Sequence, residues 1–260
     1  MKNTALITWA SSGIWKEFAY IHAQNKSDLV LVARRIQNLE KIKQDLESKY
    51  KIQVYIIQKD LTQKNAVEEI YQELQSENIN IEILINNAGF GWIGEFHQRE
   101  WKQDESMIDL NIKVLTQLTR IFLPDFIQRN SGKILNVSST ASLIPWPMQA
   151  VYYATKAYVT SLSNAISQEL EKTNVTLTNL MPGATKSEFW AKSGMDKTSL
   201  FDSTATAQSV AQDWYDAMMA GKRDIISGIT GSQKILLFVA KFLPKSFMLK
   251  QVYDRQQIKK

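Results

Sequence analysis

Near its start the chain reads Thr4-Ala5-Leu6-Ile7-Thr8-Trp9-Ala10-Ser11-Ser12-Gly13-Ile14-Trp15-Lys16, and this stretch decides the fold. A short β-type run enters a turn of small and hydroxyl residues, and a helical pattern follows. Similar β-type runs alternate with longer helical patterns, such as residues 36–49 and 65–77, along most of the chain. This alternation predicts a parallel sheet with right-handed crossovers.

Seven candidate strands are rich in Val, Ile and Leu and alternate little between apolar and polar residues, which is typical of strands covered on both faces. They are residues 4–8, 28–33, 53–57, 81–86, 133–138, 176–180 and 224–226. The sequence therefore predicts an α/β protein, a single-domain Rossmann-type doubly wound parallel sheet of about seven strands with helices on both faces. We assign residues 1–230 to this domain and residues 231–260 to a basic, amphipathic helical appendage packed on it.

The composition excludes several kinds of site. The 260 residues suit one large α/β domain and include no cysteine, so disulfides and thiol catalysis are excluded. The only imidazoles, His22 and His97, lie far apart in the sequence, so no metal site is expected. The net charge of +5 is spread along the chain apart from a basic C-terminal end, which does not favour nucleic-acid binding. Since no signal-like leader and no membrane-spanning apolar run is present, we expect a cytoplasmic protein.

A helical pattern in the second half of the chain contains Tyr152 and Lys156, which are four residues apart and therefore share one face. An unperturbed tyrosine has a pKa of about 10, and a neighbouring ammonium is expected to lower that pKa. Tyr153 is a competing tyrosine, but it is only three residues from Lys156. Ser139 lies 13 residues before Tyr152, and its hydroxyl can hydrogen-bond a reacting oxygen.

Over about residues 3–228, five motifs resemble those of the short-chain dehydrogenase/reductase family. They are the turn at residues 8–16, Asn86-Asn87-Ala88-Gly89, Asn136-Val137-Ser138-Ser139, Tyr152-Tyr153-Ala154-Thr155-Lys156 and Pro182-Gly183-Ala184-Thr185. The resemblance implies hydride transfer between a nicotinamide cofactor and a carbonyl or secondary alcohol, with Tyr152 as general acid/base. It also implies that Ser139 holds the reacting oxygen, that Lys156 tunes Tyr152 and holds the nicotinamide ribose, and that Asn111 holds a water in the proton relay.

The cofactor-binding residues implied by the resemblance lie at the ends of the predicted strands or on the catalytic helix. They are Thr8, Ser11, Ser12, Gly13, Ile14, Arg34, Arg35, Asp60, Asn87, Ala88, Gly89, Tyr152, Lys156, Pro182, Gly183 and Thr185. Arg34 and Arg35 end a strand without an acidic residue, and an arginine at this point accommodates a 2′-phosphate. NADP(H) is therefore expected in preference to NAD(H). The alternative is a pair of solvated arginines at the start of a helix.

The first turn departs from the family pattern Thr-Gly-x-x-x-Gly-x-Gly, because Trp9 and Trp15 stand at its first and third glycine positions. Those glycines permit the tight turn and close helix–strand packing, so the indoles would impair cofactor binding. Trp146 and Trp214 also stand where relatives commonly carry glycine. Our hypothesis is that several of these tryptophans are glycines encoded by a reassigned UGA codon. If they are genuine, the alternative is a cofactor-impaired relative kept as a non-catalytic binding or scaffolding protein.

The sequence of the region that would contact the substrate indicates no single substrate class. Residues 186–205 correspond to the variable substrate loop of the family, in which Phe189, Trp190 and Met195 either line an apolar pocket or pack the loop down. The resemblance implies a small carbonyl or alcohol substrate.

The C-terminal segment is basic and apolar. Residues 234–260 include seven basic residues and one acidic residue, Asp254. Such a segment either covers the substrate mouth or a subunit interface, or makes a peripheral contact with an anionic membrane surface. The resemblance also implies a homodimer or homotetramer that pairs through the helices bearing Asn111 and Tyr152.

Overall fold

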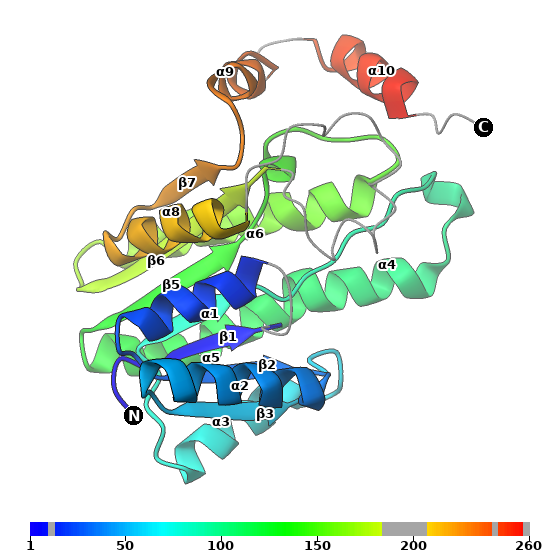
Figure 1. Ribbon diagram of the computed structural model, residues 1–260. Coiled ribbons are helices and arrows are strands. Elements are labelled where there is room, and N and C mark those ends of the chain that lie inside the picture. The colour runs from blue at the N-terminus through cyan, green and yellow to red at the C-terminus, as the bar shows by residue number, and fades with distance from the viewer. Residues whose placement is uncertain (10–13, 184–206, 241–243, 257–260) are drawn as a thin grey trace.

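A computed structural model describes residues 1–9, 14–183, 207–240 and 244–256 of the chain. At its centre is a seven-stranded sheet with strand order β3-β2-β1-β4-β5-β6-β7, and every pairing is parallel (Figure 1). The strands are β1 (Ala5–Thr8), β2 (Leu29–Ala33), β3 (Val54–Gln58), β4 (Ile83–Asn86), β5 (Gly132–Val137), β6 (Val175–Pro182) and β7 (Asp224–Ser227). All predicted strands are present, with bounds that differ by at most two residues. The predicted doubly wound α/β fold is confirmed.

Helices connect the strands throughout the described residues. The α-helices are α1 (Ile14–Gln24), α2 (Ile36–Tyr50), α3 (Ala66–Ser76), α4 (Trp101–Ile108), α5 (Leu115–Gln128), α6 (Ala150–Glu169), α8 (Ala207–Met219), α9 (Gly231–Ala240) and α10 (Lys245–Gln256). The short helices are the 3-10 turns η1 (Phe96–Gln98) and η3 (Thr140–Leu143) and the π-helical turn η2 (Asp109–Val114) between α4 and α5. The helical patterns predicted at residues 36–49 and 65–77 correspond to α2 and α3.

The sheet has an apolar cluster on each face. One cluster packs α1, α2 and α8 against side chains such as Ile7 and Leu31. The other packs α3, η2 and α5 against their strand neighbours Leu6 and Val30. Since successive strand residues point to opposite faces, both must be apolar when both faces are covered. This double burial explains the nearly continuous apolar runs in the sequence.

A row of polar residues crosses the sheet beneath its carboxyl edge. Asn86, Asn136, Asn179 and Asp224 are register partners on β4 to β7. The Asn86 amide donates to Asn136 Oδ1 (2.9 Å), the Asn136 amide to Ser163 Oγ on α6 (3.0 Å), and the Asn179 amide to Asp224 Oδ1 (2.7 Å). Buried polar groups are stable only with partners, so this row ties α6 and the four strands in one register.

The crossovers change direction between the neighbouring strands β1 and β4. The strands β2 and β3 lie on one side of this pair, and β5, β6 and β7 lie on the other. In open parallel sheets, ligands bind in the crevice at the carboxyl ends of the strands at such a switch point. The fold therefore predicts a ligand site next to Thr8 and Asn86, where these two strands end.

After β7 the chain passes to α9 and α10, which stand beyond the two helix layers (Figure 1). Helix α10 is joined to the body by a hydrogen bond of 2.9 Å from the Tyr253 hydroxyl to Glu95 Oε1. None of the helices in the described ranges combines the length and apolar character needed to cross a bilayer.

Candidate active site

Ser139 and Tyr152 meet beyond the carboxyl end of β5. Ser139 follows the strand after one residue, and Tyr152 lies in the first turn of α6. The two side chains are hydrogen-bonded to each other. Ser139 Oγ also accepts from the Ala141 N–H (3.1 Å) and donates to the Pro182 carbonyl (3.4 Å). The serine hydroxyl is therefore held by β6 and η3 next to the tyrosine hydroxyl.

The Tyr152 hydroxyl is protonated at neutral pH. Its side chain is almost completely buried, and burial raises its pKa to about 12 although the hydrogen bond with Ser139 acts in the opposite direction. The lowering of this pKa by Lys156, helped by the positive nicotinamide of the oxidised cofactor, concerns the cofactor-bound protein and stays a prediction. Lys156 Nζ lies 5.9 Å from the centre of the Tyr152 ring, and in the ligand-free protein burial of the phenol is the largest cause of its raised pKa.

Lys156 is buried and attached twice to the end of β5. Its Nζ donates to the Val137 carbonyl (2.8 Å), while its own carbonyl accepts from Ser138 Oγ (2.8 Å). The Ser138 hydroxyl also lies 2.7 Å from Thr160 Oγ1, one turn further along α6. Burial lowers the pKa of Lys156 to about 8. These bonds set the position of α6 along β5, and hence the position of the lysine in the site.

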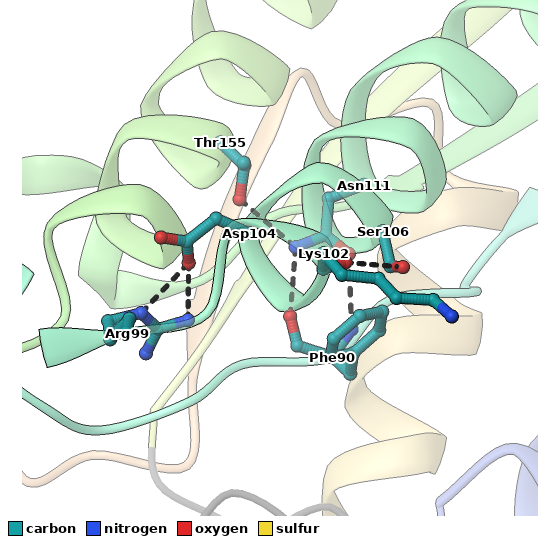
Figure 2. Close-up of polar contacts among 7 residues, drawn as sticks. All are labelled: Phe90, Arg99, Lys102, Asp104, Ser106, Asn111 and Thr155. Atoms are coloured by element: carbon teal, nitrogen blue, oxygen red, sulfur yellow. Dashed lines mark hydrogen bonds and ion pairs between the residues drawn. The ribbon is translucent and has the colours of Figure 1, made fainter.

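Asn111 lies in η2 and is only 1% exposed. Its Nδ2 donates to the Phe90 carbonyl (2.9 Å) and to Thr155 Oγ1 (3.0 Å), and its Oδ1 accepts from the Phe90 N–H (3.1 Å), as Figure 2 shows. A π-helical turn widens the helix locally and is frequent at functional sites. Asn111 thus joins the segment after β4 to α6, which carries Tyr152 and Lys156.

Gly89 lies between Asn111 and Lys156. A methyl group added to it would be 3.0 Å from Asn111 Oδ1 and 3.3 Å from Lys156 Nζ. Glycine therefore allows the backbone to approach both polar groups closely. The predicted residues Asn111, Lys156 and Gly89, distant in the sequence, are brought together here.

Thr8, Asn87 and Ala88 join the carboxyl ends of β1 and β4. Thr8 Oγ1 accepts from the N–H groups of Asn87 (3.0 Å) and Ala88 (3.1 Å) and donates to the Ile85 carbonyl (3.2 Å). The Asn87 side chain donates to the Thr8 carbonyl (3.0 Å). These buried bonds hold the switch point together, so the three residues shape the predicted cofactor site through its backbone.

Arg34 is exposed at the end of β2, and Arg35 follows as the residue before α2. Arg34 Nη1 lies 3.8 Å from Asp60 Oδ2, and its guanidinium lies 5.8 Å from the centre of the Trp9 ring. Asp60 Oδ1 accepts from the Thr62 N–H (3.0 Å). Since 64% of its side chain is exposed, Arg34 can reach an anion in solvent while Asp60 stays attached to its own turn.

Gly183 follows Pro182 at the end of β6, where another part of the chain passes close by. Its N–H donates to the Ser227 carbonyl (2.8 Å). A Cβ at this position would come within 2.2 Å of Ile229 Cγ2 and 2.9 Å of the Gly228 carbonyl oxygen. Only glycine fits this approach.

Several predicted residues lie outside the described part of the chain. They are Ser11, Ser12, Gly13 and Thr185, together with Phe189, Trp190 and Met195 of the substrate loop. Ile14 is described as the first residue of α1.

The tryptophans at predicted glycine positions have distinct surroundings. Trp9 has a φ of 59°, in the left-handed region that favours glycine. The rings of Trp15 on α1 and Trp214 on α8 lie 5.3 Å apart, and Trp214 is fully buried with its Nε1 donating to Ser227. Trp146 stacks on Tyr153 at 5.4 Å. Trp9 is therefore the position at which the backbone itself favours glycine.

A buried ion pair, which the sequence patterns did not indicate, lies near Asn111. Arg99 donates through both Nε (2.9 Å) and Nη2 to Asp104 Oδ1, joining the residue after η1 to α4 (Figure 2). Both side chains are at most 9% exposed. Their five-residue spacing in a polar stretch resembles that of surface charges, so the sequence carries no signal of this burial.

The short chain dehydrogenase family matches residues 3–198 of the chain. The NADP-dependent 3-hydroxy acid dehydrogenase of Schizosaccharomyces pombe is 34% identical over 190 residues, which cover 72% of this chain and 73% of that protein. The NADP-dependent 3-hydroxy acid dehydrogenase YdfG of Escherichia coli strain K12 is 35% identical over 179 residues, or 68% and 71% of the two chains. A short-chain dehydrogenase from Sphingobium yanoikuyae in complex with NADPH has a TM-score of 0.82 at 30% identity, covering 92% of this chain and 93% of that chain.

The doubly wound sheet, with Ser139 beside the buried Tyr152 and Lys156 at its carboxyl edge, defines an oxidoreductase of the dinucleotide-binding α/β class. The chain belongs to the short-chain dehydrogenase family, which confirms the resemblance inferred from the five motifs.

Proposed function

We propose that the protein is an NADP(H)-dependent oxidoreductase that interconverts a carbonyl compound and a secondary alcohol by hydride transfer. The observation that carries this proposal is the hydrogen bond between Tyr152 and Ser139, with the Lys156 ammonium 5.9 Å from the tyrosine ring. Two adjacent hydroxyl groups can hold one carbonyl oxygen. A protonated phenol can also transfer its proton to that oxygen as negative charge develops.

In carbonyl reduction, bound NADPH supplies the hydride that reaches the carbonyl carbon. Tyr152 is protonated at neutral pH, because burial raises its pKa to about 12, and it donates its proton to the carbonyl oxygen. Ser139 hydrogen-bonds the same oxygen and stabilises its developing charge. Lys156 then returns a proton to Tyr152, and a water held by Asn111 replaces that proton from solvent. In alcohol oxidation the same groups act in reverse.

The residues at the switch point fit a dinucleotide. The bare backbone at Gly89 supports this fit, because any Cβ there would meet Asn111 and Lys156 at the nicotinamide end. We assign the phosphate turn to residues 8–14. The exposed guanidinium of Arg34 favours a 2′-phosphate, and the S. pombe and E. coli relatives are named NADP-dependent.

The alternative is a protein of the same fold that has lost its cofactor and serves as a binding or scaffolding protein. The observation that favours it is the indole of Trp9, placed at a glycine-type backbone position beside Arg34. This alternative and the enzyme differ in nucleotide affinity.

Titration with NADPH and NADH, followed by quenching of the intrinsic tryptophan fluorescence, tests the proposal. We expect saturable quenching by NADPH at micromolar concentration, weaker quenching by NADH, and NADPH-dependent reduction of a ketone. Absence of binding by both nucleotides would contradict the enzyme and support the alternative. Binding without turnover of any carbonyl compound would contradict the assigned reaction.

We also propose that the protein forms a homodimer or homotetramer through the helices that bear Asn111 and Tyr152, which are η2 with the adjoining α4 and α5, and α6. Ile108 and Tyr158 support this pairing, because both are exposed apolar side chains on these elements. Sedimentation equilibrium tests it. A monomer at micromolar concentration would contradict it.

We further propose that residues 231–260 make a peripheral contact with a membrane. These residues are the basic appendage of the domain formed by residues 1–230. The contact is supported by the exposed side chains of Ile235 and Val239 on one face of α9. Co-sedimentation with anionic vesicles at low and high salt tests this membrane contact. A cytoplasmic protein without the contact would stay in the supernatant. Absence of pelleting in both conditions rules the membrane contact out.

A further inference from the structure

A charged pair is buried where the chain around it is exposed. Arg99 donates through Nε (2.9 Å) and Nη2 to Asp104 Oδ1, and at most 9% of either side chain is exposed. Residues 96–98 and 100–102, on both sides of Arg99, are exposed. Removing two charges from water opposes folding by about as much as their attraction favours it, so stability alone does not account for such a pair. Its directional bonds point instead to a part of the chain that must be held in one position.

The continuous helix formed by α4 and η2 presents three buried side chains on one face. They are Asp104, Met107 and Asn111, whose spacings of three and four residues place them one above another. Met107 packs in the same cluster as the Tyr152 ring. The two polar side chains therefore flank the point at which this helix meets the catalytic tyrosine.

These two polar side chains hold the ends of residues 90–99, the covering segment, which lies between β4 and α4. Asn111 accepts from the Phe90 N–H (3.1 Å) and donates to the Phe90 carbonyl (2.9 Å). Asp104 binds Arg99 at the other end of the segment (Figure 2). One face of one helix thus sets the position of both ends of the covering segment.

The middle of the covering segment lies against Tyr152 and the start of α6. A Cβ added to Gly91 would come within 2.9 Å of Tyr152 Cδ2, so the bare backbone packs on the ring. The Gly94 N–H donates to the Met148 carbonyl (2.8 Å), just before α6 begins. A Cβ added to Gly94 would lie 3.6 Å from Arg99 Cγ, so the stem of the arginine packs beside this glycine. Arg99 therefore contacts both α4 and the part of the segment that binds the start of α6.

We propose that Arg99 and Asp104 are positioning residues of the active site, because their ion pair keeps the covering segment in place over Tyr152. The inference rests on the proposed function, and it adds two residues that act on the reaction through Tyr152. Without the pair, the Phe90 end of the segment stays attached to the helix while the Arg99 end is released. The Tyr152 hydroxyl is then aligned less often with the reacting oxygen, and small misalignments lower the rate strongly.

The variant that tests the pair is Arg99→Met/Asp104→Leu, which replaces both charges by apolar side chains of similar size. Removal of one partner alone would leave an unpaired buried charge, which strongly destabilises a fold, whereas the double replacement is expected to keep Tm at or above the wild-type value. The matched control is Lys59→Met/Glu69→Leu. It removes a 2.8 Å ion pair between the residue that follows β3 and the next helix, α3.

Hydrogen exchange of the ligand-free proteins, read by mass spectrometry, tests the hold on the covering segment without turnover. The amides of Phe90 and Gly94 are suitable probes, since both are hydrogen-bonded. In Arg99→Met/Asp104→Leu we expect residues 90–94 to exchange on the order of tenfold faster, as for loss of one charge-assisted hydrogen bond. The control should exchange there at the wild-type rate. An unchanged rate in the Arg99 and Asp104 variant would overturn the proposal.

Kinetics separate a positioning role from a purely structural one. The substrate is whichever of acetone, acetophenone and acetoacetate the wild-type protein reduces best with NADPH. We expect kcat of Arg99→Met/Asp104→Leu to fall by about tenfold or more, with the Kd for NADPH nearly unchanged and both values at the wild-type level in the control. A wild-type kcat would overturn the proposal. A lower kcat together with a Tm lower by about 10 °C or more would also overturn it, because the pair would then serve the fold alone.

Failure of the proposed function has a different signature. If none of the three carbonyl compounds is reduced, the proposed function fails, and the effect of the pair on the reaction fails with it. The exchange experiment still decides whether Arg99 and Asp104 hold the covering segment.

Discussion

The Ser138 hydroxyl donates a hydrogen bond of 2.8 Å to the backbone carbonyl of Lys156. The bond joins the end of β5 to the middle of α6 and is buried. Since Ser139 follows on one side of it and the Tyr152–Lys156 turn lies on the other, it sets the distance between Ser139 and that turn.

The first prediction concerns this bond. Ser138→Ala should lower kcat by about tenfold or more while the Kd for NADPH changes little. The reason is that loss of the bond displaces the reacting groups, and a small displacement lowers the rate strongly. Steady-state kinetics and a nucleotide titration measure the two quantities. Ser76→Ala is the matched control, since it removes a 2.8 Å serine-to-carbonyl bond at the surface of α3. A wild-type kcat in Ser138→Ala would show that α6 keeps its position without this bond.

The second prediction separates the two neighbouring tyrosines. Tyr152→Phe should lower turnover by about two orders of magnitude or more, because it removes the proton donor, yet leave NADPH affinity nearly unchanged. Tyr153→Phe is the control, since its ring stacks on Trp146 and the substitution keeps that ring. Loss of cofactor binding together with turnover in Tyr152→Phe would mean that the base has been assigned to the wrong residue.

The third prediction concerns Trp9. A non-glycine residue with a φ of 59° carries backbone strain of about 1–2 kcal/mol, and its indole borders the site assigned to the phosphates. Trp9→Gly should therefore bind NADPH more tightly than the tryptophan form, as measured by titration. Trp101→Gly, which removes an exposed indole at the start of α4, should not change that affinity.

The coding DNA gives an independent test of the same hypothesis. TGA at codons 9, 15, 146 and 214 would support glycine in the natural polypeptide. TGG at codons 9 and 15 would contradict it, and the cofactor-impaired alternative would then gain support.

The fourth prediction concerns the choice of nucleotide. Arg34→Ala should raise the Kd for NADPH by roughly tenfold or more and leave the Kd for NADH nearly unchanged, because only NADPH offers a 2′-phosphate for a charge-assisted bond. Arg120→Ala, which removes an exposed arginine from α5, is the control. An equal loss of affinity for both nucleotides would show that Arg34 does not read the phosphate.

The fifth prediction concerns His22, which is buried with its Nε2 2.9 Å from the Asn3 carbonyl. Burial lowers the pKa of His22 from 6.5 to about 4. Between these values the unfolded chain binds a proton that the folded protein does not, so stability increases with pH. The free energy of unfolding should be retained above about pH 6.5 and should fall by about 3 kcal/mol on acidification to about pH 4.

Urea unfolding at several pH values measures this dependence. His22→Gln should flatten the pH dependence between those limits, whereas His97→Gln should not, because His97 is exposed. An unchanged slope in His22→Gln would assign the acid sensitivity to other groups.

The sequence by itself was sufficient for the parallel sheet. Each strand carries apolar residues on both faces; on β1, for example, Leu6 and Ile7 lie on opposite faces. This double burial can be predicted from the local composition. The spacing of Ser139, Tyr152 and Lys156 was equally readable, because a helix places residues four apart on one face.

The long-range contacts that hold that site follow from tertiary packing. The pKa of Tyr152 depends on how completely its ring is buried, and burial raises it to about 12 in the ligand-free protein. Likewise, no local pattern predicts that Asn111 hydrogen-bonds both the N–H and the carbonyl of Phe90, or that the Tyr253 hydroxyl donates to Glu95. Such contacts join residues that are distant in the chain, so they exist only once the elements have packed.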